Sequence, residues 1–90
     1  MFEVVVHPHA LKHGISESDI LYAWENFIAK QRRTAPREDE TILVGCTKNG
    51  RLVEVVGIDK PYGTLIYHAY APPTISMLDE LGLRGGGRRR

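Results

Sequence analysis

Two β-rich runs separated by Lys48-Asn49-Gly50 constrain the fold of this chain more than any other feature. Residues 40–47 and 51–58 are rich in valine, isoleucine, leucine and threonine, as strands are. Asn-Gly between two such runs is the strongest short-range hairpin signal, because both residues tolerate the left-handed backbone that a tight turn needs. We therefore predict two antiparallel strands joined by this turn.

Further strands are predicted on either side of this hairpin. Residues 2–6 form a β-branched run that His7-Pro8 ends, since proline suits the first position of a short helix. Residues 28–33 have weak apolar content and predict an edge strand, whereas residues 64–70 predict a stronger one. Pro72-Pro73 then ends the sheet, because proline has no N–H to donate to a strand ladder.

Helices are predicted before and after the strands. Gly14 ends the short first helix, and Ser16 caps a main core helix over residues 17–27. The apolar residues of this helix recur at spacings of three and four. They are Ile20, Leu21, Trp24, Phe27 and Ile28. Thr74 caps a last helix over residues 75–81.

This order of elements predicts an α+β domain over residues 1–83. We expect an antiparallel meander sheet of about four to five strands, with two N-terminal helices and one C-terminal helix. Residues 84–90 contain only arginine and glycine and are expected to form a flexible tail. The net charge of +1 includes the four arginines of this tail, so residues 1–83 carry −3. Any RNA contact must therefore come from a local patch or from the tail.

Several classes of protein are excluded by what the sequence lacks. The single cysteine, Cys46, cannot form an intramolecular disulfide, and no apolar run approaches the roughly 20 residues of a membrane span. We expect a cytoplasmic protein with no membrane association and no cofactor, since no glycine-rich phosphate loop is present. Zinc binding by His7, His9, His13 and His68 is disfavoured because the first two straddle a strand end, so no metal is expected.

Lys12 and His13 are the first candidate catalytic residues. They lie at the end of the short first helix, a position that favours positive charge and suits a phosphate partner. The alternative is that the pair serves only to complement the helix dipole.

Glu54, His68 and Tyr70 are the other candidate catalytic residues. Glu54 interrupts an apolar strand, and His68 and Tyr70 share one face of the last strand by two-residue alternation. If the two strands are neighbours, one sheet face carries all three side chains and offers a general acid and base without a metal. In the alternative, Glu54 pairs with a lysine or arginine on the solvent side and the other two are half-buried packing residues.

Four basic residues outside the tail are candidates for binding RNA phosphates. They are Lys30, Arg32, Arg33 and Arg51. The first three lie in one short basic segment, which is the kind of local patch that an otherwise acidic domain needs.

Four segments of the chain form a recognisable set. They are Lys12-His13-Gly14-Ile15-Ser16, the amphipathic helix after it, the strand Thr41-Ile42-Leu43-Val44-Gly45 with its hairpin, and the strand Leu65-Ile66-Tyr67-His68-Ala69. With these segments the chain resembles the BrnT-type toxins of the RelE-like ribonuclease superfamily, over residues 2–81. The resemblance implies a RelE-like fold and the toxin role in a bacterial type II toxin–antitoxin system. The implied activity is a metal-independent endoribonuclease that works by 2′-hydroxyl attack. The implied partners are a cognate antitoxin protein and RNA, including mRNA on the ribosome. The implied site residues are Lys12, His13 and His68.

One departure from that family concerns the end of the last strand. Its members usually place one or two arginines after the residue that matches Ala69, where this chain has Tyr70-Ala71-Pro72-Pro73. Either Arg32, Arg33 or the tail supplies the missing cation, or the chain is a weakened toxin. In the second case it is a non-catalytic module that binds an antitoxin-like protein through exposed faces of Tyr22, Trp24 and the last helix.

Overall fold

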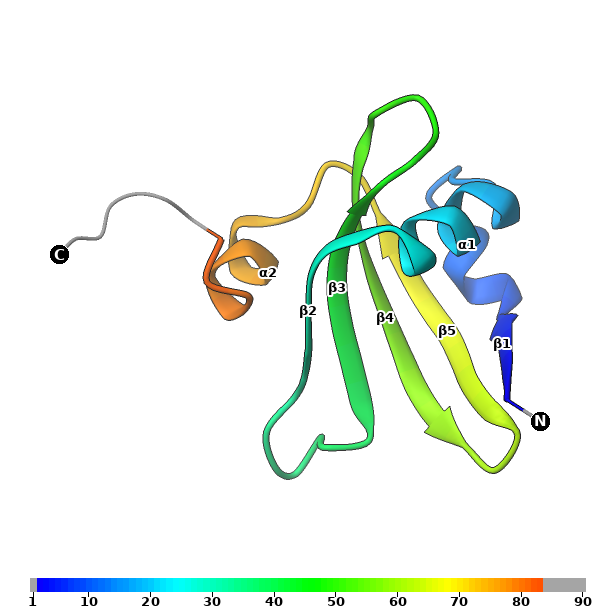
Figure 1. Cartoon of the computed structure of the whole chain (residues 1–90), viewed down its shortest axis with the longest axis vertical. Helices are drawn as coiled ribbons and strands as arrows, with labels where there is room; N and C mark the ends of the chain where they lie inside the picture. The colour runs from blue at the N-terminus through cyan, green and yellow to red at the C-terminus, as the bar shows by residue number, and fades with distance from the viewer. Residues whose placement is uncertain (1, 84–90) are drawn as a thin grey trace, which may run out of the picture.

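The structure of this chain is a computed structural model that describes residues 2–83 (Figure 1). Its elements follow the predicted order. They are β1 (Glu3–Val6), the 3₁₀ helix η1 (Pro8–Leu11), α1 (Glu17–Glu25), β2 (Phe27–Arg32), β3 (Glu40–Cys46), β4 (Leu52–Lys60), β5 (Gly63–Tyr70) and α2 (Ile75–Glu80). The expected tail, residues 84–90, lies outside the described residues. In the described part of the chain, no helix is long and apolar enough to cross a membrane.

The five strands form one mixed sheet in the order β1-β5-β4-β3-β2. The predicted hairpin is confirmed, because β3 and β4 pair antiparallel with Cys46 opposite Leu52. The strands from β2 to β5 form an antiparallel meander, and β2 is an edge strand as predicted.

The α+β class is confirmed, but the expectation of a purely antiparallel meander is wrong. β1 pairs parallel with β5, and Val6 lies opposite Ile66. After β1 the chain passes through η1 and α1 to the far edge of the sheet, so β5 is the strand that returns beside β1. No local turn signals a pairing between segments so far apart in the sequence.

The main core lies between α1 and one face of the sheet. Ser16 Oγ accepts a hydrogen bond of 3.2 Å from Asp19 N and so caps α1 as predicted. The helix ends at Glu25, earlier than predicted, where the Asn26 side chain donates to the Tyr22 carbonyl oxygen and the chain enters β2. Gly45 permits close packing here, because a Cβ at this position would lie 2.5 Å from the Ala23 carbonyl oxygen.

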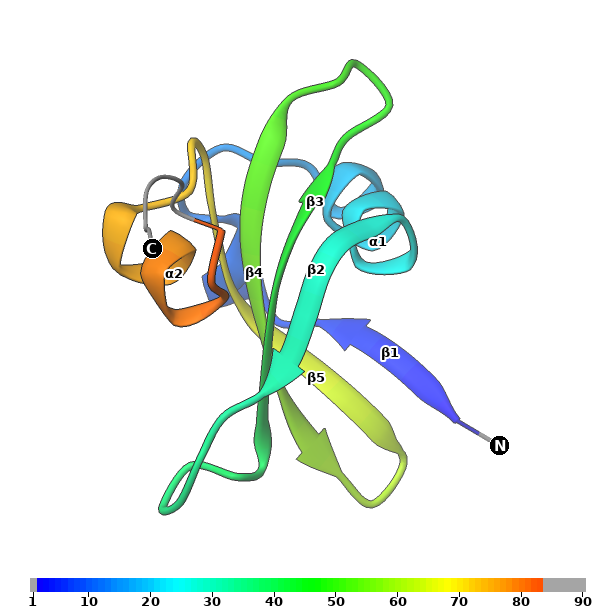
Figure 2. The same cartoon turned by 60° about the vertical axis from the view of Figure 1, so that its left-hand side comes forward.

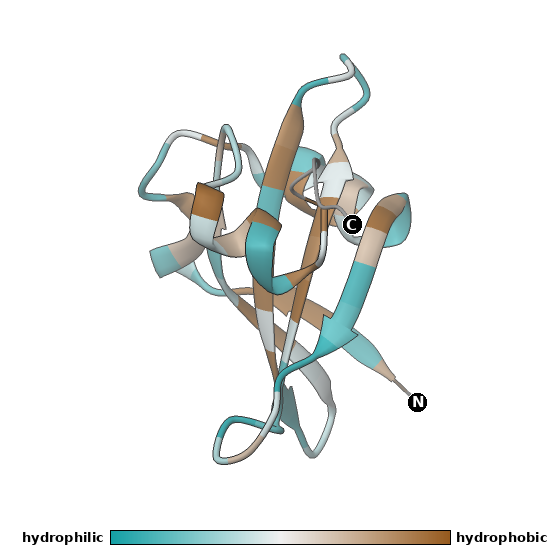
Figure 3. Cartoon of the chain, turned by 90° about the vertical axis from the view of Figure 1, so that its left-hand side faces the viewer, coloured by the Kyte–Doolittle hydropathy of each residue, from teal (hydrophilic) through white to brown (hydrophobic). Residues whose placement is uncertain are grey.

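The short helix α2 covers part of the opposite face of the sheet, as Figure 2 shows. Met77 packs there against Ile42, Val44 and Val56. Thr74 caps this helix as predicted, since its Oγ1 accepts a hydrogen bond from Met77 N. The hydropathy colouring of Figure 3 shows largely hydrophobic central strands, whereas β2 becomes hydrophilic toward the β2–β3 turn. Each face of the central strands is therefore covered by a helix over part of its length.

Candidate active site

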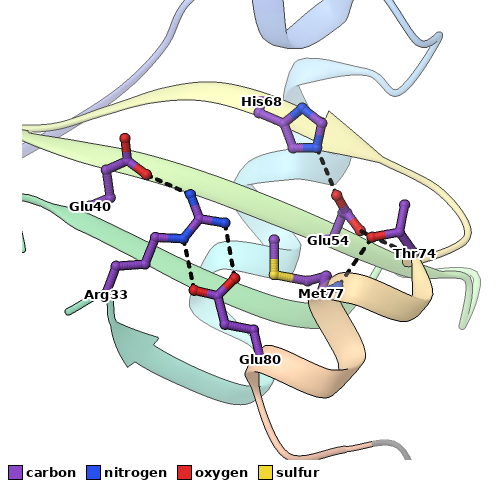
Figure 4. Close-up of polar contacts among 7 residues, drawn as sticks. All are labelled: Arg33, Glu40, Glu54, His68, Thr74, Met77 and Glu80. Carbon is purple, nitrogen blue, oxygen red and sulfur yellow. Dashed lines mark hydrogen bonds and ion pairs between the residues drawn. The ribbon is translucent and has the colours of Figure 1, made fainter. Parts of the chain in front are cut away.

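Glu54 and His68 form a close polar pair on the face that α2 covers. The β4–β5 register places Glu54 opposite Tyr70 and Val56 opposite His68, so the predicted sharing of one face by Glu54, His68 and Tyr70 is confirmed. Glu54 Oε2 lies 2.8 Å from His68 Nε2 (Figure 4). The Glu54 side chain is 5% exposed and that of His68 is 31% exposed. The partner of Glu54 is thus a histidine, and not the lysine or arginine of the alternative interpretation.

The second carboxylate oxygen of Glu54 is held by Thr74. Oε1 accepts hydrogen bonds from Thr74 N at 2.7 Å and from Thr74 Oγ1 at 2.9 Å. Burial acts to raise the pKa of Glu54, but the hydrogen bonds from His68 and Thr74 outweigh it and lower that pKa below its ordinary value. Glu54 is therefore a buried carboxylate that stays ionised at neutral pH.

Because Glu54 is ionised, it determines which nitrogen of the His68 ring carries a proton. A carboxylate can only accept, so Nε2 of His68 must carry a proton and donate it to Glu54. A neutral His68 ring then has its lone pair on Nδ1, the nitrogen that can accept a proton from a substrate. This is the arrangement expected of an oriented general base.

His13 completes the cluster from the loop after η1. Its ring meets the Tyr70 ring edge to face, with 4.8 Å between centroids and an interplanar angle of 87°. The centroids of the His13 and His68 rings are 6.2 Å apart. The structure thus brings His13, Glu54, His68 and Tyr70 together, and exposed Lys12 occupies the C-cap of η1 next to His13.

A pocket of about 250 Å³ opens on the α2 side of Glu54 and His68. Arg33 borders it and is bound by two carboxylates (Figure 4), with Arg33 Nη1 2.6 Å from Glu40 Oε1 and Arg33 Nε 2.9 Å from Glu80 Oε2. The hydrogen bond to Glu80 raises the pKa of Arg33 most, burial lowers it, and the bond to Glu40 raises it further. Arg33 therefore remains charged, and each of its three nitrogens already donates a hydrogen bond to Glu40 or Glu80.

The other predicted RNA-binding residues do not share this surface. Lys30 pairs with Leu43 of the α1-side core, and its Nζ lies 5.2 Å from the Trp24 ring centroid. Arg32 donates to Asp59 Oδ2 at 2.7 Å. Arg51 is exposed where the β3–β4 turn meets β4. The four basic residues do not form one patch: Lys30 and Arg32 lie on the α1 side of β2, Arg33 lies on the α2 side, and Arg51 lies at the β3–β4 turn.

The structure corrects one expectation about partner contacts and adds residues that the sequence did not single out for the site. Trp24 is only 8% exposed and belongs to the main core, so it presents no free face to a partner. Thr74 was predicted only as a helix cap, and nothing in the sequence indicates that it also binds Glu54. Likewise, no local signal connects Arg33 with Glu80. Within residues 2–83, no group of three or more histidine, cysteine or acidic side chains is arranged to hold a metal ion.

No protein-family model, curated protein or solved structure matches this chain.

Proposed function

We propose that this chain is a metal-independent endoribonuclease that acts as the toxin of a type II toxin–antitoxin system. The observation that supports it most is the buried Glu54 carboxylate 2.8 Å from His68, with the His13 ring beside them. Two imidazoles with 6.2 Å between their centroids can flank a single phosphate group, one as base and the other as acid.

In the proposed reaction, Nδ1 of His68 takes the proton of a ribose 2′-hydroxyl while Glu54 stabilises the resulting imidazolium. The 2′-oxygen attacks the adjacent phosphorus, so the O2′–P bond forms and the P–O5′ bond breaks. His13 donates a proton to the departing 5′-oxygen. The products are a 2′,3′-cyclic phosphate and a 5′-hydroxyl, and no metal or water enters this step.

Lys12 is the cation that we assign to the charge developing on the phosphate. Arg33 is occupied by Glu40 and Glu80, and Arg32 is bound to Asp59. Neither is free to replace the arginine that the resemblance leads one to expect after Ala69. Lys12 is exposed beside His13, and an ammonium group there acts as a point charge on phosphate oxygens.

The proposal includes the partners that the resemblance implies. RNA is the substrate, mRNA on the ribosome included, and a cognate antitoxin protein would hold the toxin inactive in the cytoplasm. Exposed apolar side chains suited to such a partner are Phe27 and Ile28 on the edge strand β2, 47% and 57% exposed, and Ile75 on α2, 62% exposed. The RelE-like arrangement of the fold is part of the same proposal.

The deciding experiment combines RNA cleavage with expression in cells. We expect the purified protein to cleave single-stranded RNA in EDTA and to leave 2′,3′-cyclic phosphate ends. His68→Ala and His13→Ala should each lower kcat by about 100-fold or more. Induced expression should stop growth and degrade RNA for the wild type but not for the Lys12→Ala, His13→Ala double variant.

Lys48→Ala serves as the control, because it removes an exposed cation on the β3–β4 turn and should leave the activity unchanged. Circular dichroism shows whether each variant is folded. If the wild type leaves RNA intact both with and without ribosomes, the ribonuclease proposal is wrong, and a non-catalytic module that binds a partner protein becomes the better explanation.

A further inference from the structure

α2 covers only the part of its sheet face nearest the β3–β4 turn. In Figure 2, no helix of the described chain lies over the same face toward the β4–β5 turn. There the side chains of Ile58, Leu65 and Tyr67 are half-buried and form the floor of an open groove of about 490 Å³. Ile58 and Leu65 are direct cross-strand neighbours. This volume is within the range of about 300–1,000 Å³ that is usual for small-ligand sites.

The groove adjoins the candidate active site at Tyr67. This residue lines both the groove and the pocket beside Glu54 and His68. The β4–β5 register shifts between Val56 and Gly57, leaving Tyr67 as an extra residue in β5. Such a bulge places Tyr67 and His68, although successive in sequence, on the same side of the sheet.

The rim of the groove offers hydrogen-bond donors and positive charge. His7, His9 and Lys60 line it and are exposed. His7 Nδ1 accepts a hydrogen bond of 2.9 Å from His9 N, so the proton of a neutral His7 ring lies on Nε2 and can be donated. Among the described residues, Glu40 alone gives the lining an acidic group, and its charge is balanced by Arg33. A polyanion with flat apolar rings matches this combination.

We propose that this groove binds the base of the nucleotide next to the scissile phosphate of single-stranded RNA. The base would stack on Tyr67 and on the aliphatic side chains of Ile58 and Leu65, while the rim donors contact its polar edge or the next phosphate. Stacking on aromatic side chains accepts every base, and single strands are the form of RNA whose bases can enter such a groove. This inference rests on the proposed function, because it assigns a substrate subsite to the same active site.

The test uses 2′-O-methyl RNA tetranucleotides of uniform A, C or U sequence, which cannot undergo 2′-hydroxyl attack. Binding to the full chain is measured by fluorescence anisotropy, and the methyl resonances of Ile58 and Leu65 are followed by NMR. Leu65→Asp puts a carboxylate on the groove floor and should weaken binding by about 10-fold or more. Lys48→Glu is the control, because it reverses an exposed charge on the β3–β4 turn away from the groove, and it should change binding less than about twofold.

Lys60→Glu provides a second variant on an exposed rim position, in case Leu65→Asp does not fold. The proposal is supported if both groove variants weaken binding and the tetranucleotides shift the two methyl resonances. It is overturned if wild type and groove variants bind and cleave RNA alike, which would leave the proposed function standing. It is also overturned if the wild type binds no tetranucleotide. If the wild type binds through the groove yet cleaves no RNA, the proposed function fails while the binding of an RNA base in the groove is supported.

Discussion

Glu54 connects a strand, a histidine and a helix cap through one buried carboxylate. Burying an ion in a small domain is costly unless hydrogen bonds replace its water shell. Here three donors do so, from His68 Nε2, Thr74 N and Thr74 Oγ1. The same bonds that keep Glu54 charged also orient the His68 ring and position the start of α2.

The lowered pKa of Glu54 makes stability depend on pH in a defined direction. A carboxyl whose pKa is lower in the folded state stabilises the fold above its unfolded pKa, about 4.3, and that stability is lost as pH falls through the folded value. Glu54→Gln keeps the shape but not the charge. We expect it to lower the free energy of unfolding by about 1–3 kcal/mol at pH 7.

Urea unfolding of wild type and Glu54→Gln at pH 7, 5 and 3 checks this prediction. The difference between the two proteins should persist at pH 5 and shrink below about pH 4, because the unfolded wild-type chain then takes up a proton at Glu54 that the folded state resists. Glu25→Gln, at an exposed helix end, is the control and should show a difference near zero. A difference that stays constant down to pH 3 would show that the charge of Glu54 is not what stabilises the fold.

At the scale of elements, α2 depends on tertiary contacts for its existence. A six-residue helix is not stable alone, because too few hydrogen bonds offset the cost of nucleation. Besides Met77 in the core, polar contacts hold both ends. At the start of the helix, Thr74 N donates a hydrogen bond to Glu54. At its end, the Glu80 carboxylate accepts a hydrogen bond from Arg33, and the Glu80 carbonyl oxygen accepts one from Gln31 Nε2.

Replacing Arg33 should therefore loosen α2. The Arg33 side chain is 14% exposed, so Arg33→Ala leaves Glu40, 13% exposed, with an unpaired charge. We expect a loss of about 1–3 kcal/mol in the free energy of unfolding and faster hydrogen exchange at Leu78, whose amide bonds to Thr74 O.

Arg32→Ala is the matched comparison for that prediction. The Arg32–Asp59 pair is equally short, but its side chains are 53% and 50% exposed. Solvent screens such a pair, so the expected cost is below about 1 kcal/mol and exchange in α2 should not change. Equal effects of the two variants on α2 would contradict the role assigned to Arg33.

For the whole molecule, the parallel pairing of β1 with β5 completes the five-stranded sheet. Glu3 lies opposite Gly63, and Glu3 N donates to the Tyr62 carbonyl oxygen at 2.9 Å. Gly63 has a φ of 146°, and a Cβ there would overlap the Glu3 carbonyl oxygen. The first strand can dock only because this position has no side chain.

Gly63→Ala should consequently displace the start of β1. We expect at least about 2 kcal/mol of destabilisation in urea unfolding, together with loss of amide protection in β1. Two causes contribute to this loss, the positive φ and the overlap of the new Cβ with Glu3. Gly50→Ala tests the first cause alone, because Gly50 also has a positive φ, 81°, but nothing lies within 4 Å of its added Cβ. Gly50→Ala should cost only about 1 kcal/mol. If the two variants are equally destabilised, steric exclusion of β1 is not the reason.

Local sequence rules predicted most elements and part of the site. The Asn49-Gly50 turn determined the β3–β4 pairing, and the hydroxyls of Ser16 and Thr74 determined where two helices begin. Two-residue alternation was enough to place Glu54 and His68 on one face once their strands were neighbours. These features depend on residues close in sequence or on adjacent strands, where short-range geometry leaves few alternatives.

Only the tertiary structure decided the remaining features, because they join residues that are distant along the chain. The parallel β1–β5 contact and the Glu54–Thr74 hydrogen bonds have no local signal. The basic segment 30–33 was predicted as one patch, yet strand alternation sends Lys30 toward Trp24 and Arg33 toward Glu80. The sequence alone determined the elements and their order. The way they pack decided which side chains meet, since burial and charge pairing are settled only when both sheet faces are covered.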